Sequence, residues 1–255
     1  MSVALACTCR LTRDLDRFQK MRPLLEKVYA GIAVAASTNV SAHVLSDVND
    51  PPFVRTVVQR DGSRSGYLAI EKSLEIPVSH IHYCELDRLL HWIATNPIEW
   101  CETVEMIQKT DCLIIGRTEK AFQTYNQAAQ QTERVINTVF SRLLGRPIDL
   151  CSGNRGFSRR AALFLANHSQ PEGLEDAAWP MLLHRTGFRV DYVARDSLDF
   201  EHPEGVPESA VRWGQRGWHD VTHDQDPQQW VKKVRSALEI VQDGLVALQQ
   251  PLTFL

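Results

Sequence analysis

The sequence lacks several features that mark membrane, secreted or nucleic-acid-binding proteins. No apolar run in its 255 residues approaches the ~18 residues of a membrane span. The first residues, MSVALAC, lack the basic segment of a signal peptide. The net charge of −3 includes no excess of basic side chains, which argues against a nucleic-acid partner. We therefore expect a soluble, cytoplasmic protein without a transmembrane segment.

The cysteines do not form the CxxC pairs of metal or redox sites. They are scattered, and several stand in apolar runs typical of buried strands. We interpret them as reduced, buried thiols, at positions 7, 9, 84, 101, 112 and 151. The chain also contains no internal repeat, low-complexity tract or linker. These absences favour one continuous domain.

Short apolar runs alternate with helical patterns along the chain, which predicts an α/β fold with a mostly parallel sheet covered by helices. Buried strands are predicted at residues 3–9, 32–36, 53–59, 112–116 and 188–193. Helices are predicted at residues 15–29, 67–74, 98–109, 121–144 and 161–167. We divide the chain into a main domain, residues 1–205, and a helical C-terminal extension, residues 206–255, packed on it. The extension ends in an amphipathic helix at 228–249.

The stretch from Val78 to Arg88 is predicted to be a buried strand that ends in two acids, Glu85 and Asp87. In an extended chain, residues two apart point to the same side. We therefore expect the two carboxylates to project together. They repel each other unless a divalent cation, a basic side chain or water lies between them.

Three further segments carry polar groups where a ligand would meet the backbone. The turn with Gly62, Arg64 and Gly66 precedes a helix and suits an anion, although an ordinary turn with a solvated arginine has the same pattern. The Ser-Gly-Asn-Arg segment at 152–155 brings a glycine close to an arginine, as backbone beside a ligand does. Acids at 175–176 open a helix, where the helix dipole also favours them.

These segments, in this order, resemble the glycosyltransferases of the GT-A fold, within the broad family 2-like group of nucleotide-diphospho-sugar transferases. The resemblance covers about residues 1–205. It implies a Rossmann-like sheet and transfer of a sugar from a nucleotide-diphosphate donor to a hydroxyl of a small-molecule or glycan acceptor. It also implies a Mn²⁺ or Mg²⁺ ion at the acid-x-acid element, held by Asp87 and His202.

The resemblance assigns roles to the other polar residues as well. Asp176 would be the catalytic base and Glu175 a ligand of a sugar hydroxyl, or the reverse. The nucleotide, the phosphates and the sugar would contact Thr8, Arg10, Ser37 to Asn39, Gly62, Arg64, Gly66, Glu85, Ser152, Gly153, Asn154 and Arg155. The donor base, the donor sugar, the acceptor and the stereochemistry stay open.

Alternatives remain at this stage. His80, His82 and Cys84 alternate onto one strand face and, with His202, would suit a zinc-dependent hydrolase. A sugar-nucleotide-binding protein without turnover would keep the same motifs. The apolar stripe of the terminal helix is equally compatible with packing on its own domain and with a homodimer.

Overall fold

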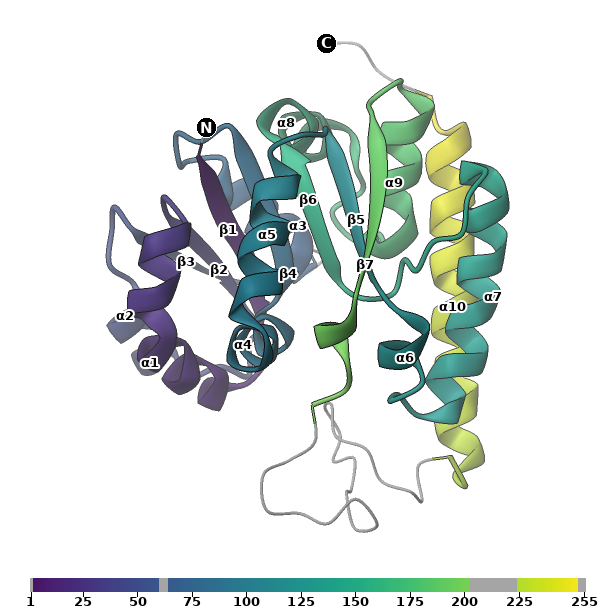
Figure 1. The fold of residues 1–255 in the computed structure, drawn as a ribbon, viewed down its shortest axis with the longest axis horizontal. Helices are drawn as coiled ribbons and strands as arrows, with labels where there is room; N and C mark the ends of the chain where they lie inside the picture. The colour runs from purple at the N-terminus through teal and green to yellow at the C-terminus, as the bar shows by residue number, and fades with distance from the viewer. Residues whose placement is uncertain (1, 60–63, 202–223, 252–255) are drawn as a thin grey trace.

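The structure, a computed structural model, describes residues 2–59, 64–201 and 224–251. A seven-stranded sheet lies between two layers of helices, in the order β3-β2-β1-β4-β6-β5-β7 (Figure 1). Neighbouring strands are parallel except around β6, which runs antiparallel to β4 and β5. The predicted α/β class with a mostly parallel sheet is thus confirmed. The strands are β1 Val3–Cys9, β2 Ile32–Ala36, β3 Val54–Val58, β4 His80–Glu85, β5 Cys112–Arg117, β6 Asn154–Ser158 and β7 Val190–Arg195.

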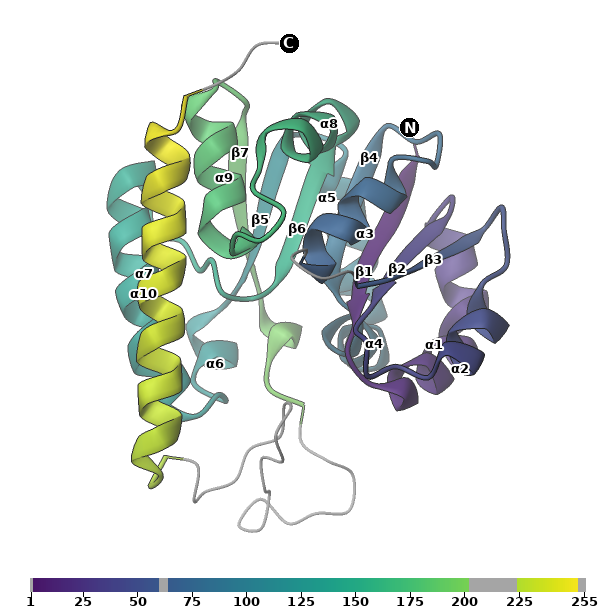
Figure 2. The same ribbon diagram turned by 180° about the vertical axis from the view of Figure 1, so that it is seen from behind.

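Each face of the sheet has its own hydrophobic core. Side chains of β1 alternate, so that Leu5 and Cys7 join one core while Ala4 and Ala6 join the other. The first core is covered by α1 Thr12–Val28, α2 Ala42–Val48, α4 Leu86–Thr95 and α5 Pro97–Ile107. The second is covered by α3 Ser65–Ser73, α7 Gln127–Leu144, α8 Arg159–His168, α9 Glu175–Arg185 and α10 Pro227–Gln249 (Figure 2).

The single helix predicted at 121–144 is in fact two helices. The short helix α6, Glu119–Phe122, ends before α7 begins at Gln127. The side chain of Asn126 accepts a hydrogen bond from the Ala129 backbone N–H at 2.6 Å and so caps α7. An asparagine at this position is a standard helix-start signal, and the prediction overlooked it.

Strand β4 ends at Glu85, and α4 begins with the next residue. The leucines of the first turns of α4 are buried at helical spacing. A helix that begins at once therefore buries more apolar surface than a longer strand would. Asp87 therefore lies in the first helical turn. The prediction that Glu85 and Asp87 project together from an extended strand is wrong.

The terminal helix α10 packs against α7 and α9, and both ribbon views place α7 and α10 side by side (Figures 1 and 2). The carboxylate of Asp243 on α10 accepts a hydrogen bond from the Leu174 backbone N–H at 2.7 Å, directly before α9 begins. This helix thus holds the start of α9 in place. The short 3₁₀ helix η1, Asp196–Leu198, follows β7. In the described ranges, no helix combines the length and apolarity that crossing a membrane requires.

Candidate active site

A cavity of about 690 Å³ opens at the carboxyl ends of the parallel strands. It lies where the strand order reverses, because β1 has β2 on one side and β4 on the other. Such a switch point is the usual ligand site of an open α/β sheet. The wall consists of Thr8, Arg10, Ser37, Asn39, Gln59, Arg64, Ser65, Gly66, Tyr83, Glu85, Gly153, Arg155, Glu172, Leu174, Glu175, Asp176 and Trp179.

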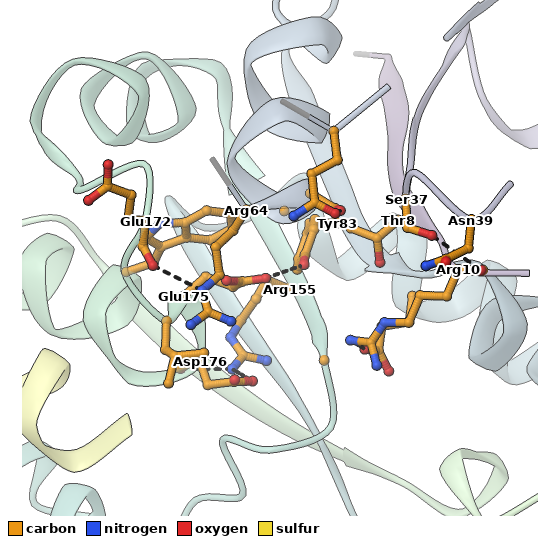
Figure 3. A pocket seen from close by; sticks show the side chains of 17 residues that line it. Thr8, Arg10, Ser37, Asn39, Arg64, Tyr83, Arg155, Glu172, Glu175 and Asp176 are labelled. Carbon is orange, nitrogen blue, oxygen red and sulfur yellow. Dashed lines mark hydrogen bonds and ion pairs between the residues drawn. The ribbon is translucent and has the colours of Figure 1, made fainter. Parts of the chain in front are cut away.

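The two ends of this cleft differ in chemistry (Figure 3). Thr8, Arg10, Ser37 and Asn39 gather at one end, whereas acids from the loop before α9 and from its first turn gather at the other. Ser37 donates a hydrogen bond from Oγ to the Arg10 carbonyl oxygen at 3.3 Å, which joins the ends of β1 and β2. The cleft can thus hold an elongated ligand with a hydroxyl-rich end and an end beside carboxylates.

Two arginines hold the carboxylate of Glu85. The distance from Arg10 Nη2 to Glu85 Oε1 is 2.5 Å, and Arg88 Nε lies 2.6 Å from Glu85 Oε2. Burial alone would raise the pKa of Glu85, but the two cations outweigh it and lower that pKa to about 2. Arg88 also donates to the Ser152 carbonyl oxygen at 2.9 Å. Basic side chains therefore neutralise the first acid, and the sequence interpretation had assigned no role to Arg88.

Asp87 is exposed and lines a second cavity of about 310 Å³. Arg10 and Glu85 line both cavities, so the two meet at this ion pair. Glu201 lines the second cavity too, and the next residue, His202, falls outside the described ranges. Among the described residues, no three histidine, cysteine or acidic side chains gather as a metal site. Mg²⁺ sites often use only one or two carboxylates together with substrate phosphates, and Asp87 suits that arrangement.

The histidines of β4 belong to the core. His82 is fully buried, with Nδ1 2.7 Å from the Tyr29 hydroxyl, which also accepts a hydrogen bond from Trp100 Nε1 at 2.8 Å. Burial lowers the pKa of His82 to about 3, so the ring is neutral at physiological pH. His80 Nδ1 lies 3.0 Å from Ser79 Oγ. These contacts give the histidines a packing role, and the described residues contain no zinc cluster around them.

The acid pair opens α9 at the far end of the cleft. Tyr83 donates its hydroxyl hydrogen to Glu175 Oε1 at 2.9 Å. Burial and, after it, the neighbouring charge of Glu175 raise the pKa of Asp176 to about 7, although the cation of Arg155 opposes both. Asp176 can therefore gain and lose a proton near neutral pH.

The environment of Asp176 depends on a proline. Pro180 lies inside α9 and has no N–H to donate to the carbonyl oxygen four residues earlier, which belongs to Asp176. Arg155 Nη2 donates to that oxygen at 2.9 Å instead, and the same nitrogen is 4.0 Å from Asp176 Oδ1. Arg155 is only 2% exposed and serves chiefly to hold backbone around the site.

The residues predicted for the glycine-bearing segments have separate positions. Arg64 lines the cleft, and its Nε donates to the Glu172 carbonyl oxygen at 2.9 Å, so it also anchors the loop before α9. Ser152 and Asn154 are fully buried below the cleft and hydrogen-bond to backbone. Gly62 lies outside the described ranges. Tyr83 was overlooked, although strand alternation places it on the same face as Glu85.

A side chain at Gly66 would collide with two side chains of the cleft. A Cβ atom there would be 2.3 Å from Glu175 Oε1 and 2.6 Å from the Tyr83 hydroxyl oxygen. We predict that Gly66→Ala breaks the Tyr83–Glu175 hydrogen bond and costs about 1–3 kcal/mol of unfolding free energy through overpacking. Urea unfolding would measure this cost. Ser65→Ala on the same turn is the control, and an equal effect of both substitutions would contradict the prediction.

No family model and no curated protein sequence matches this chain. Among solved structures, glucosyl-3-phosphoglycerate synthase from Mycobacterium tuberculosis is similar, with 12% identity over 99% of this chain and 82% of the other, at a TM-score of 0.53. Its complex with Mn²⁺, UDP-glucose and phosphoglyceric acid is 11% identical over 99% of this chain and 81% of the other, at a TM-score of 0.54. A mycobacterial protein is 13% identical over 86% of this chain and 82% of the other, at a TM-score of 0.51. This similarity concerns architecture, and it establishes that the chain has the GT-A fold of nucleotide-diphospho-sugar transferases.

Proposed function

We propose that this protein is a glycosyltransferase that moves a sugar from a nucleotide-diphosphate-sugar to a hydroxyl acceptor. The observation that carries the proposal is the carboxyl of Asp176, whose pKa of about 7 suits a general base, in a 690 Å³ cleft at the carboxyl ends of the strands. The GT-A fold supports it, because a protein of this fold holds Mn²⁺ and UDP-glucose in its crystals.

In this proposal the base and ribose of the donor lie at the end of the cleft with Thr8 and Ser37, and the sugar lies toward Glu175. Asp176 removes the proton from the acceptor hydroxyl while its oxygen attacks the anomeric carbon. The bond from that carbon to the diphosphate oxygen breaks, and its electron pair leaves with the nucleoside diphosphate. Arg10 lies at the Thr8 end of the cleft and also lines the adjoining cavity of Asp87, so its guanidinium can stabilise the negative charge of the leaving group.

Asp87 and His202 are the residues that would hold Mn²⁺ or Mg²⁺ in this proposal. A divalent ion there would add Lewis-acid stabilisation of the diphosphate. The exposed carboxylate of Asp87 lies in the cavity that adjoins the cleft at Glu85, which suits an ion shared with a ligand phosphate.

A thermal-shift screen of UDP-, GDP-, ADP- and dTDP-sugars, with and without Mn²⁺, tests the donor and the metal together. We expect one base to raise the melting temperature and Mn²⁺ to increase that shift, because a ligand of the native state stabilises it. In Asp87→Ala we expect the part of the melting-temperature shift that depends on Mn²⁺ to disappear, while the shift with nucleotide-sugar alone remains.

The matched control for this screen is Asp16→Ala, an exposed acid on α1. It should keep the full Mn²⁺ effect. An unchanged Mn²⁺ effect in Asp87→Ala would remove Asp87 from the metal site. A wild-type protein that no nucleotide stabilises would overturn the proposed function itself.

A further inference from the structure

A smaller cavity of about 180 Å³ lies beside the main cleft, between α7 and α10. Thr132 and Glu133 line it from α7, and Lys233 and Ser236 line it from α10. The terminal helix therefore contributes polar side chains to a cavity next to the proposed site. The sequence interpretation gave this helix no chemical role.

Asp176 lines both cavities. The shared wall also contains Arg10, Glu85 and Gly153. A carboxylate at such a boundary can take a proton from a molecule in one cavity while a second molecule reacts in the other. A base that serves two substrates needs this placement, because the reacting atoms must lie close together before transfer.

The charges around the smaller cavity leave capacity for an anion. Lys233 Nζ is 4.0 Å from Glu133 Oε1, but Glu133 already has a closer partner in Arg117, at 2.6 Å. Arg10 and Arg88 also line this cavity and share the single carboxylate of Glu85. Three cations therefore face the cavity, whereas two of its three carboxylates, those of Glu85 and Glu133, are already held by arginines. The third, Asp176, is the proposed base at the boundary with the main cleft. The ammonium of Lys233 has the weakest ion pair of this group.

We propose that this α7–α10 cavity binds the acceptor, and that the acceptor is a small hydroxylated anion whose carboxylate or phosphate is bound by Lys233. The inference rests on the proposed function and deepens it by naming the acceptor class. At 180 Å³ the cavity is much smaller than the 690 Å³ main cleft, which leaves the larger space to a nucleotide-sugar. The smaller space suits an acid of a few carbon atoms, with its hydroxyl beside Asp176 and its anionic group beside α10.

Three probes with the same three-carbon skeleton test the proposal: glycerate, glycerol 3-phosphate and glycerol. Each is titrated by calorimetry into the full chain, in the wild-type, Lys233→Met and Lys232→Met forms. Lys232 is the matched control, because it is the exposed neighbour on the same helix. We expect at least one anion to bind the wild type and Lys232→Met alike, to bind Lys233→Met at least tenfold more weakly, and to bind more tightly than glycerol.

The anion that loses more affinity in Lys233→Met identifies the bound group as a carboxylate or a phosphate. Arg64→Gln separates the two cavities, since an anion in the main cleft would respond to that substitution instead. Equal anion binding by the wild type and Lys233→Met, equal binding of glycerol, or no anion binding at all would overturn the inference.

The nucleotide screen on the same proteins distinguishes the two proposals. If the protein binds a nucleotide but Lys233→Met does not change the affinity for the anions, the acceptor site is ruled out and the proposed transferase function is not. If the protein binds no nucleotide but binds an anion through Lys233, the proposed transferase function is ruled out and the anion site remains.

Discussion

Replacing Asp176 with asparagine is expected to lower the transfer rate by about 10²–10⁴-fold, the usual contribution of a general base, with little change in donor affinity. The wild-type rate should rise with pH through about 7, because only the ionised carboxylate of Asp176 can accept the acceptor proton. Asp176→Asn should lose that pH dependence together with the rate. Initial rates from pH 5.5 to 9, with nucleotide affinity measured alongside, provide the test.

Glu175→Gln is the informative companion variant. The charge of Glu175 helps to raise the pKa of Asp176, so its removal should move the rise in rate to lower pH. If Glu175→Gln instead abolished the rise and Asp176→Asn kept it, the two residues would have the reverse roles. Full activity of Asp176→Asn would rule that residue out as the base.

The substitution Asp176→Asn should also make the protein more stable than the wild type at alkaline pH. The pKa of Asp176 is raised from 3.8 to about 7 by folding, so above pH 7 the native state contains a carboxylate that it disfavours. This penalty grows as pH rises from about 4 to 7 and is absent at lower pH, where both states are protonated. Asp176→Asn should therefore melt higher than the wild type at pH 8 and equally near pH 3. A lower melting temperature at pH 8 would indicate a structural defect instead.

The continuous buried strands were the most predictable part of the fold. Residues 3–9 and 32–36 are apolar runs bounded by polar residues, and their predicted bounds match β1 and β2. The bend after Glu85 was less predictable, because the strand pattern and the helical leucines of α4 meet without a turn residue between them. Local periodicity fixes an element's type better than its end.

The polar partners of the site depended on long-range packing. Lys233 shares a cavity with Glu85, although 148 positions separate them in the sequence, and no local pattern links the two. Arg155 was predicted to border the ligand from its place beside a glycine, and it does line the cleft. Its hydrogen bond to the Asp176 carbonyl oxygen, which Pro180 leaves without a helical donor, was not predictable from the local sequence. One sequence shows which polar groups exist, and the packing decides which of them meet.

The largest stability effect is expected at Arg117. Its side chain is fully buried, and its Nε and Nη2 donate to the two carboxylate oxygens of Asp149 at 2.7 and 2.9 Å. The guanidinium also lies over the rings of Tyr125 and Phe122, 4.5 and 4.6 Å from their centroids. Arg117→Met keeps an unbranched apolar stem in place of the arginine's but removes the guanidinium, and so leaves Asp149 buried without its cation. We expect this to cost about 3–5 kcal/mol of unfolding free energy, measured by urea unfolding at pH 7.

Arg134→Met is the matched control for this measurement. Arg134 pairs with Glu119 and lies 5.0 Å from the same Phe122 ring, but both members of its ion pair are about half exposed. Such a pair contributes about 0–1 kcal/mol. If both methionine variants lost the same small amount, the buried network would not be a major source of stability.

Acidic pH should distinguish loss of the cation from loss of packing. In the wild type, Arg117 outweighs the effect of burial and keeps the pKa of Asp149 well below its ordinary value, so the ion pair persists at pH 5. Without Arg117, burial raises that pKa, and protonation at pH 5 relieves the unpaired charge. The difference in unfolding free energy between Arg117→Met and the wild type should therefore be smaller at pH 5 than at pH 7. If that difference in free energy stayed constant, Arg117 would stabilise the protein through packing against Tyr125 and Phe122 rather than through its charge.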